Sequence, residues 1–394
     1  MIRMKYKGFL AALAAVCIAN SSAWAGPADD ASRAYLKADY DKALALARPA
    51  AEAGDAAAQN ILGALYLHGQ GLRRDPSEAV KWYRRSAEQG NPEAQWKLGW
   101  LYQKGLGVKR DYAEAGEWYR KSAEQGNPWG ENGLGWAYQK GWGVKQDSAK
   151  AAKWFRKAAE QGNQGGQHGL GWLYEKGLGV KRDYSEAAKW YQSAAEQGNQ
   201  HAQCGLGNLY AHGHGVKKDY AEAAKWYREA AEQGSPNGQM HLGFLCEKGL
   251  GVEKNFTEAY KWYFLADLHA NAKGRQGLER LQKVMTKGQN SEAQKAVAEW
   301  CRKAAEQGKP DGQSGLGFLF ENGLGMVQDY VEAYKWYLLA SAQYNANGRK
   351  GLKRLRPRMT TEEVAQAKKL ASSFKIDPRA AAPPPPTPSA APEE

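Results

Sequence analysis

Apolar and small residues recur along this chain at the spacing of helix faces, in pairs of segments separated by glycine-containing turns. Residues 92–127 show the pattern most clearly. The first predicted helix, helix A, would bury positions three and four apart: Ala94, Leu98, Leu101 and Tyr102. The second, helix B, would bury Ala115, Trp118, Tyr119 and Ala123. The pattern predicts a helix-turn-helix unit of 36 residues.

Turn and cap residues mark where the two helices begin and end. Gly105 and Gly107 interrupt helix A where the backbone needs a positive φ. Asp111, with Glu114 three residues later, predicts a capping-box start for helix B, and Gly126 predicts its end. Corresponding pairs occur in other units as Asp75/Glu78, Asp183/Glu186, Asp219/Glu222, Asn255/Glu258 and Asp329/Glu332.

A tryptophan of helix B repeats with a fixed period, once in each predicted unit. It recurs every 36 residues at Trp82, Trp118, Trp154, Trp190, Trp226 and Trp262. The next one, Trp300, comes two positions late, and Trp336 follows at the regular interval. A period of this length is typical of repeat proteins, whose units stack and bury a shared core. We therefore expect an all-α solenoid, with these tryptophans and the aromatic residues that follow them in its core.

The repeats divide the chain into segments. We expect a degenerate N-terminal capping repeat at 26–55, six repeats over 56–271 and another over 310–345. The intervening segment, 272–309, predicts an internal cap-like repeat, and 346–379 predicts C-terminal capping helices.

The two cap-like segments share a motif that the other units lack. Residues 274–281, Gly-Arg-Gln-Gly-Leu-Glu-Arg-Leu, resemble residues 348–355, Gly-Arg-Lys-Gly-Leu-Lys-Arg-Leu. Each motif is followed by Met-Thr and an alanine-rich segment. This similarity indicates a partial duplication, and it predicts a discontinuity in the solenoid near 272–298.

The two ends of the chain differ in composition from the repeats. Residues 1–25 combine a basic leader, about ten apolar residues and a small-x-small site ending at Ala25, which predicts a cleaved secretory signal peptide. A transmembrane anchor is less favoured, because the apolar stretch is too short to span a bilayer. We therefore expect a periplasmic or secreted protein without stable membrane insertion. Residues 380–394 are rich in proline and predict a disordered tail.

The repeated residues identify a family. The pattern Leu-Gly-x-x-Tyr-x-x-Gly-x-Gly-Val-x-x-Asp-x-x-x-Ala-x-x-Trp-Tyr-x-x-Ala-Ala-Glu-Gln-Gly resembles the Sel1-like repeat, a relative of the tetratricopeptide repeat, over most of residues 56–345. The resemblance implies a right-handed α/α superhelix whose concave side is lined by helix A. It also implies an adaptor that assembles protein complexes, in bacteria often for envelope assembly, signalling or host interaction.

The charge distribution bears on the class of partner, and the cysteine spacing bears on disulfide bonds. The formal net charge is +13, or +10 without residues 1–25, but Lys and Arg are spread through the repeats beside Asp and Glu and we see no dense basic run. This distribution is typical of solvated helix faces, so we do not expect nucleic-acid binding. Cys204, Cys246 and Cys301 have no repeated spacing and predict buried small side chains rather than a disulfide framework.

The candidate partner-binding residues come from the resemblance. Positions of helix A that line the groove of the tetratricopeptide fold correspond here to Trp96, Trp100, Lys104, Trp136, Lys140, Trp172, Lys176, Phe244 and Lys248. Aromatic anchors beside cations suit an extended peptide with hydrophobic and acidic side chains. The alternative is that these rings pack between neighbouring helices A and only stabilise the fold.

No catalytic motif supports an enzyme. The pair His212 and His214 lacks a third metal ligand at a fixed spacing, and nucleophile, phosphate-loop and dinucleotide motifs do not occur in the sequence. We expect neither a metal nor a cofactor. We favour a non-enzymatic exported scaffold whose partner is a protein or extended peptide, which could include a host protein. The alternatives are a peptidoglycan- or glycan-binding envelope protein and, by family resemblance, a weak β-lactamase-like or penicillin-binding member.

Overall fold

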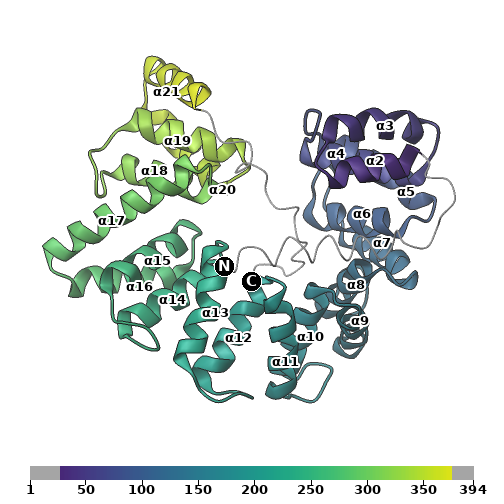
Figure 1. Ribbon diagram of the computed structural model, residues 1–394, viewed down its shortest axis with the longest axis horizontal. Helices are drawn as coiled ribbons and strands as arrows, with labels where there is room; N and C mark the ends of the chain where they lie inside the picture. The colour runs from purple at the N-terminus through teal and green to yellow at the C-terminus, as the bar shows by residue number, and fades with distance from the viewer. Residues whose placement is uncertain (1–26, 375–394) are drawn as a thin grey trace. The chain divides into compact units, whose positions relative to one another are not determined.

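The computed structural model describes residues 27–374, so the expected signal peptide at 1–25 and the proline-rich tail at 380–394 lie outside the described residues. Every regular element in the described range is helical, which confirms the all-α fold class. The chain forms two compact units that divide after Gln146. Within each unit nearly every helix packs against the next one along the chain (Figure 1).

The first unit contains seven described helices. They are α2 (Pro27–Leu36), α3 (Tyr40–Glu52), α4 (Ala56–His68), α5 (Pro76–Glu88), α6 (Pro92–Lys104), α7 (Tyr112–Glu124) and α8 (Pro128–Lys140).

The second unit begins with seven helices that continue the same alternation. They are α9 (Ser148–Glu160), α10 (Gln164–Lys176), α11 (Tyr184–Glu196), α12 (Gln200–His212), α13 (Tyr220–Glu232), α14 (Pro236–Lys248) and α15 (Phe256–Leu268). The remaining helices are α16 (Ala272–Val284), α17 (Lys287–Glu306), α18 (Pro310–Asn322), α19 (Tyr330–Ala342), α20 (Ala346–Leu355), the 3₁₀ turn η1 (Arg356–Arg358) and α21 (Thr361–Ser373).

Helix B begins at the predicted aspartate, but not with the predicted capping box. Asp111 accepts hydrogen bonds from the backbone N–H groups of Ala113 and Glu114, as an N-cap should. Its own N–H donates to the carbonyl of Tyr102 at the end of α6, at 3.0 Å. That donor is therefore not available to the Glu114 carboxylate, and the second half of the box is replaced by a bond that fixes helix B against helix A. Reciprocal capping boxes occur instead at Thr286 and Thr360, in the two cap-like segments.

Two glycine positions explain how closely the helices approach. Gly107 has φ +71°, and a methyl group there would overlap with the carbonyl of Pro76 at the start of α5. Gly99 faces the ring of Tyr119, where an added Cβ would lie only 3.0 Å from the ring atoms. Gly133 contacts the same ring from α8. The tyrosine is thus held between the glycine-containing faces of helices A from two successive repeats.

Glutamines join the two helices of a repeat to each other and to the end of the preceding repeat. The Gln125 side chain at the end of α7 donates to the Oε1 of Gln95 on α6, at 2.8 Å, and Gln95 donates to the carbonyl of Ala87 at 3.1 Å. The same pair recurs as Gln197 with Gln167 and as Gln233 with Gln203. Because the exposed glutamine of the recurrent Ala-Glu-Gln-Gly motif satisfies the buried amide of helix A, the motif has a structural role.

The recurrent tryptophan is less buried than predicted. Only three of the eight are buried, and the other five are half-buried: Trp82, Trp154, Trp190, Trp226 and Trp300. In contrast, the residue after each tryptophan is enclosed, as at Tyr83, Tyr191 and Tyr227. At Trp154, one of the half-buried rings, a cation covers the indole: the Lys157 Nζ lies 4.3 Å from the centre of the ring. The core position is therefore one residue later than the tryptophan that marks the repeat.

The two cap-like segments share a buried ion pair. Glu247 on α14 accepts hydrogen bonds from Arg280 on α16, at 3.1 and 2.5 Å, and from the Tyr263 hydroxyl at 2.8 Å. In the terminal segment, Glu321 accepts from Arg354 at 2.8 and 2.5 Å and from the Tyr337 hydroxyl at 2.7 Å. The same three residue types in the same geometry, at the same relative positions along the chain, support the partial duplication.

Candidate functional site

In the first unit, tryptophan rings on two helices A, α6 and α8, form a surface that we call the ring surface. It consists of Trp96, Trp100 and Trp129. Trp96 and Trp100 on α6 are half-buried, and Lys104 at the end of that helix is exposed. Trp96 stacks on Trp129 of α8, with ring centres 5.7 Å apart and planes inclined by 29°. The stack therefore joins neighbouring repeats while part of each ring stays accessible to a ligand.

A lysine that the sequence did not single out completes this surface. The Lys97 Nζ lies 5.8 Å from the centre of the Trp96 ring and 3.3 Å from the Asn60 Oδ1 of the preceding repeat. It also forms an ion pair with Glu93 at 3.2 Å. Burial alone would raise the pKa of Glu93, but the charge of Lys97 and hydrogen bonds to the carboxylate outweigh it and lower the pKa. The surface thus carries a fixed cation beside two indole rings.

Trp136 differs from its counterpart Trp100. It lies on α8 with only 4% of its surface exposed, so the structure corrects the expectation that this ring is available to a partner. Trp100 and Trp136 occupy the same repeat position, and only the side chains around them differ. A periodic pattern places both on the same face but does not determine how far neighbouring side chains cover each ring. Lys140, four residues after Trp136, is exposed.

In the second unit the four remaining candidate residues lie on two helices A. Trp172 on α10 is half-buried against a core that includes Ala187 and Leu206, and Phe244 on α14 is 40% exposed. Lys176 and Lys248 are exposed and each pairs with the preceding glutamate, Glu175 at 2.7 Å and Glu247 at 2.8 Å.

A pair of histidines in the second unit occupies the positions of the tryptophan stack. His168 and His201 lie two repeat lengths after Trp96 and Trp129, and their ring centres are 5.6 Å apart. Burial, with a smaller contribution from His201, lowers the pKa of His168 to about 3. Burial also lowers the pKa of His241, which stacks on Tyr227 at 4.7 Å, to about 4. Both imidazoles are therefore neutral near pH 7 and present uncharged ring faces.

Trp129 and His201 were missed because the groove positions were taken from the resemblance alone. The signal was present in the sequence, since the step along the chain from Trp96 to Trp129 is the same as the step from His168 to His201. This spacing joins one helix A to the first turn of the next helix A.

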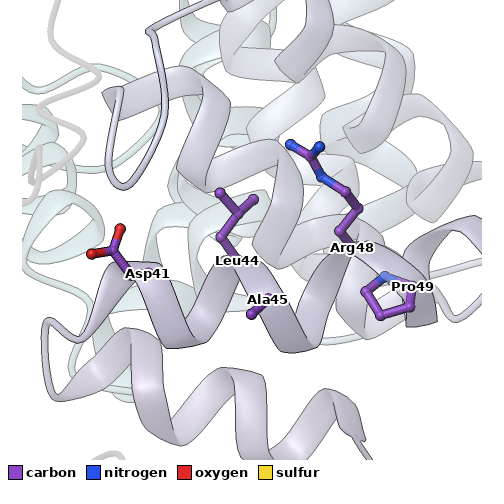
Figure 2. A pocket seen from close by; sticks show the side chains of 5 residues that line it. All are labelled: Asp41, Leu44, Ala45, Arg48 and Pro49. Atoms are coloured by element: carbon purple, nitrogen blue, oxygen red, sulfur yellow. The ribbon is translucent and has the colours of Figure 1, made fainter.

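Hollows on the surface are shallow. One of about 320 Å³ lies along α3 and is lined by Asp41, Leu44, Ala45, Arg48 and Pro49. Figure 2 shows these side chains along one stretch of a single helix, with Asp41 and Pro49 at its two ends. Another of about 250 Å³ lies between α15 and α17, beside Trp300. We assign no chemistry to either hollow.

Groups of three or more His, Cys, Asp or Glu placed to hold a metal ion do not occur within residues 27–374. His212 and His214 stack at 5.5 Å, and His214 also stacks on Tyr184. The three cysteines of the described range, Cys204, Cys246 and Cys301, are free and buried, as expected for small core side chains. Of the helices described, none has the length and apolar character needed to cross a membrane.

Comparison with known proteins identifies the repeats. The Sel1 repeat family model matches residues 32–55, 56–91, 92–127, 130–163, 165–199, 200–235, 236–266, 298–309 and 310–345. A Sel1 repeat protein from Oxalobacter formigenes is 34% identical over 62% of this chain and 97% of that chain, with a TM-score of 0.57. A protective antigen present in uropathogenic Escherichia coli strains, which displays an SLR fold, is 32% identical over 87% of this chain and 89% of that one, with a TM-score of 0.43. The search of curated proteins finds no match. The chain therefore belongs to the Sel1 repeat family.

Proposed function

We propose that this protein is a non-enzymatic, exported scaffold that binds an extended acidic segment of a partner protein on its helix-A surfaces. A solenoid of Sel1 repeats is the architecture of a protein-interaction scaffold, because stacked repeats present a long row of equivalent positions. Export rests on the leader-like residues 1–25, and a role in envelope assembly, signalling or host interaction would follow from it.

The observation that carries the proposal is the half-exposed ring surface of α6 and α8. Trp96, Trp100 and Trp129 each keep accessible area, so a ligand side chain that covers them gains further apolar burial, at about 25 cal/mol per Å². Tryptophan is among the residue types most often found at binding hot spots.

Exposed lysines near the ends of helices A suggest the charge of the partner. Within the part of the chain that the structure describes, Lys104 and Lys140 form no ion pair or hydrogen bond with another side chain. Because the fold does not use these charges, they are available to carboxylates of a partner. We therefore expect an extended segment with apolar or aromatic residues beside Asp or Glu.

Selection of displayed random peptides against the full chain tests this proposal. We expect enrichment of peptides with acidic and aromatic residues, and loss of that enrichment in the variant Trp100→Ala/Lys104→Glu. Trp226→Ala is the matched control, because Trp226 is also a half-buried tryptophan but lies on helix B. Equal loss in the control and the Trp100 variant would reject the proposed surface.

Binding to peptidoglycan tests the alternative that the partner is a glycan. Purified peptidoglycan sacculi that retain the wild-type protein but not the Trp100→Ala/Lys104→Glu variant, together with no enriched peptide, would replace the peptide partner by a glycan. Hydrolysis of a chromogenic cephalosporin by the purified chain would contradict the non-enzymatic assignment.

A further inference from the structure

The C-terminal cap carries a concentration of positive charge that the repeats do not have. Residues 349–358 contain six Lys and Arg and no Asp or Glu, which corrects our expectation that the chain has no dense basic run. All six are exposed, and four of them, Arg349, Lys350, Lys353 and Arg356, form no ion pair within residues 27–374. The buried residues of α20 are Gly348, Gly351 and Leu355. At 100° per residue, Arg349, Lys350 and Lys353 therefore lie on the opposite side of the helix, and Arg356 follows the end of α20 as the first residue of η1.

Most of this charge is not balanced within the cap. Arg354 pairs with Glu321, and Arg358 lies 3.7 Å from the same carboxylate. Among residues 27–374, Arg349 and Arg356 donate to backbone carbonyls, those of Tyr344 and Met359. Lys350 and Lys353 have no ion pair or hydrogen-bond partner within residues 27–374. In the repeats, by contrast, lysine commonly pairs with a glutamate three or four residues away, as Lys189 does with Glu186.

The internal copy of this helix shows that the fold does not need these cations. Helix α16 keeps the arginine of the buried glutamate–arginine ion pair, which we call the clamp. Arg280 lies there at the position of Arg354. The positions of Lys350, Lys353 and Arg356 are occupied in that copy by Gln276, Glu279 and Gln282. The same helix thus packs through the same clamp without the three charges, so their presence at the terminal cap calls for another explanation.

This arrangement of charges fits the surface of a lipid bilayer better than a nucleic acid whose bases are recognised. The face offers cationic side chains along a short helix, and α20 itself contains none of the aromatic side chains that would stack on bases. Tyr344, which precedes the N-cap residue of α20, is 53% exposed and holds a left-handed backbone with φ +63°. Exposed tyrosine beside lysine and arginine is typical of the interface between a bilayer and water.

We propose that the α20 face docks this protein peripherally on an anionic phospholipid bilayer. The cations of this face would lie against the phosphate groups, and Tyr344 would lie at the level of the headgroups. Each Lys or Arg near such a surface strengthens binding about fivefold at physiological salt, and the attraction falls off within about 8–10 Å. Several cations together therefore give reversible binding that high salt removes.

Sedimentation of the full chain with phosphatidylcholine vesicles, with and without phosphatidylglycerol, tests the proposal. The test variant is Lys350→Gln/Lys353→Glu/Arg356→Gln, which introduces the residues of the internal copy and changes the net charge by −4. The control is Lys181→Glu/Lys217→Glu, which makes the same change in net charge at two exposed lysines of the repeat turns. A melting curve and a circular dichroism spectrum establish that each variant is folded.

We expect the wild type to bind only the vesicles that contain phosphatidylglycerol, the test variant to bind about a hundredfold more weakly, and the control to bind nearly as the wild type. Equal binding of wild type and test variant would overturn the proposal, and so would an equal loss in the control. Binding to double-stranded DNA or to polyglutamate but not to the vesicles would replace the bilayer by another polyanion. If the triple variant does not fold, Lys350→Gln/Arg356→Gln serves with the same expected direction.

Discussion

Replacement of Arg280 by Gln tests the buried clamp between α14 and α16. Glu247 is only 5% exposed, and its carboxylate accepts from Arg280, from Tyr263 and from Lys248. Burial alone would raise the pKa of Glu247, but these hydrogen bonds outweigh it and lower the pKa to about 2. Without Arg280, a buried carboxylate would lose its main charged partner.

The pKa of Glu247 gives the size of the effect. The difference between about 2 in the folded chain and about 4.3 in the unfolded chain corresponds to about 3 kcal/mol. Because the Arg280 side chain is about half exposed and remains hydrated, we reduce this to about 1–2 kcal/mol. The folded pKa is the lower one, so this stability is present above about pH 5 and is lost as the pH falls toward 2.

A second substitution separates the charge from the packing. In the repeat of residues 92–127, Gln103 occupies the position of Glu247 and accepts the Tyr119 hydroxyl at 2.5 Å without an arginine. We therefore expect Arg280→Gln to lower the local free energy of unfolding by about 1–2 kcal/mol at pH 7. Adding Glu247→Gln should recover about 1 kcal/mol, because no buried charge then remains without its partner.

Hydrogen exchange of amides in α14, α15 and α16 measures these changes locally, which matters because a long repeat array need not unfold in a single step. Equal destabilisation of Arg280→Gln and the double variant would refute the reasoning, since the loss would then not come from the unpaired carboxylate. The deficit of Arg280→Gln should also shrink at low pH, where Glu247 is protonated in both proteins.

Three further predictions concern the core. Gly133→Ala should cost about 1–3 kcal/mol, because the methyl group overlaps with the Tyr119 ring, and urea denaturation would detect the loss; a neutral result would show that the two helices separate easily. Tyr227→Ala should lower the melting temperature more than Trp226→Ala, since only the tyrosine is enclosed, and the reverse order would contradict the assignment of the core position. The three buried thiols should react with Ellman's reagent only as fast as the chain unfolds, because burial raises the pKa of Cys204 to about 11 and that of Cys246 above its ordinary range; rapid reaction of the native chain would contradict their burial.

The periodic features of the fold could be predicted from the sequence because they are local. An aspartate before an apolar face caps helix B at Asp111, and glycine with positive φ ends helix A at Gly105, in this repeat and in most others. The alternation of two helices follows from these signals together with the 36-residue period. The family resemblance, which the matched segments confirm, rests on the same residues.

The candidate surface could be predicted only in part, because exposure depends on neighbouring repeats. Trp100 and Trp136 share one repeat position, but only Trp136 is enclosed. The partners of Trp96, namely Trp129 and Lys97, belong to the next repeat and to the adjacent position of the same helix. A pattern of single positions does not contain such pairs, whereas the constant spacing between rings of successive helices A does.

The most direct test of the central claim is the affinity of a selected acidic peptide for wild type, Trp100→Ala and Trp226→Ala, measured by isothermal titration. The two tryptophans are both half-buried, so the two variants should lose similar stability. If helix A forms the binding surface, Trp100→Ala should weaken binding at least about tenfold and Trp226→Ala should leave it unchanged. Similar affinities for both variants would contradict the claim that the partner contacts the rings of helix A.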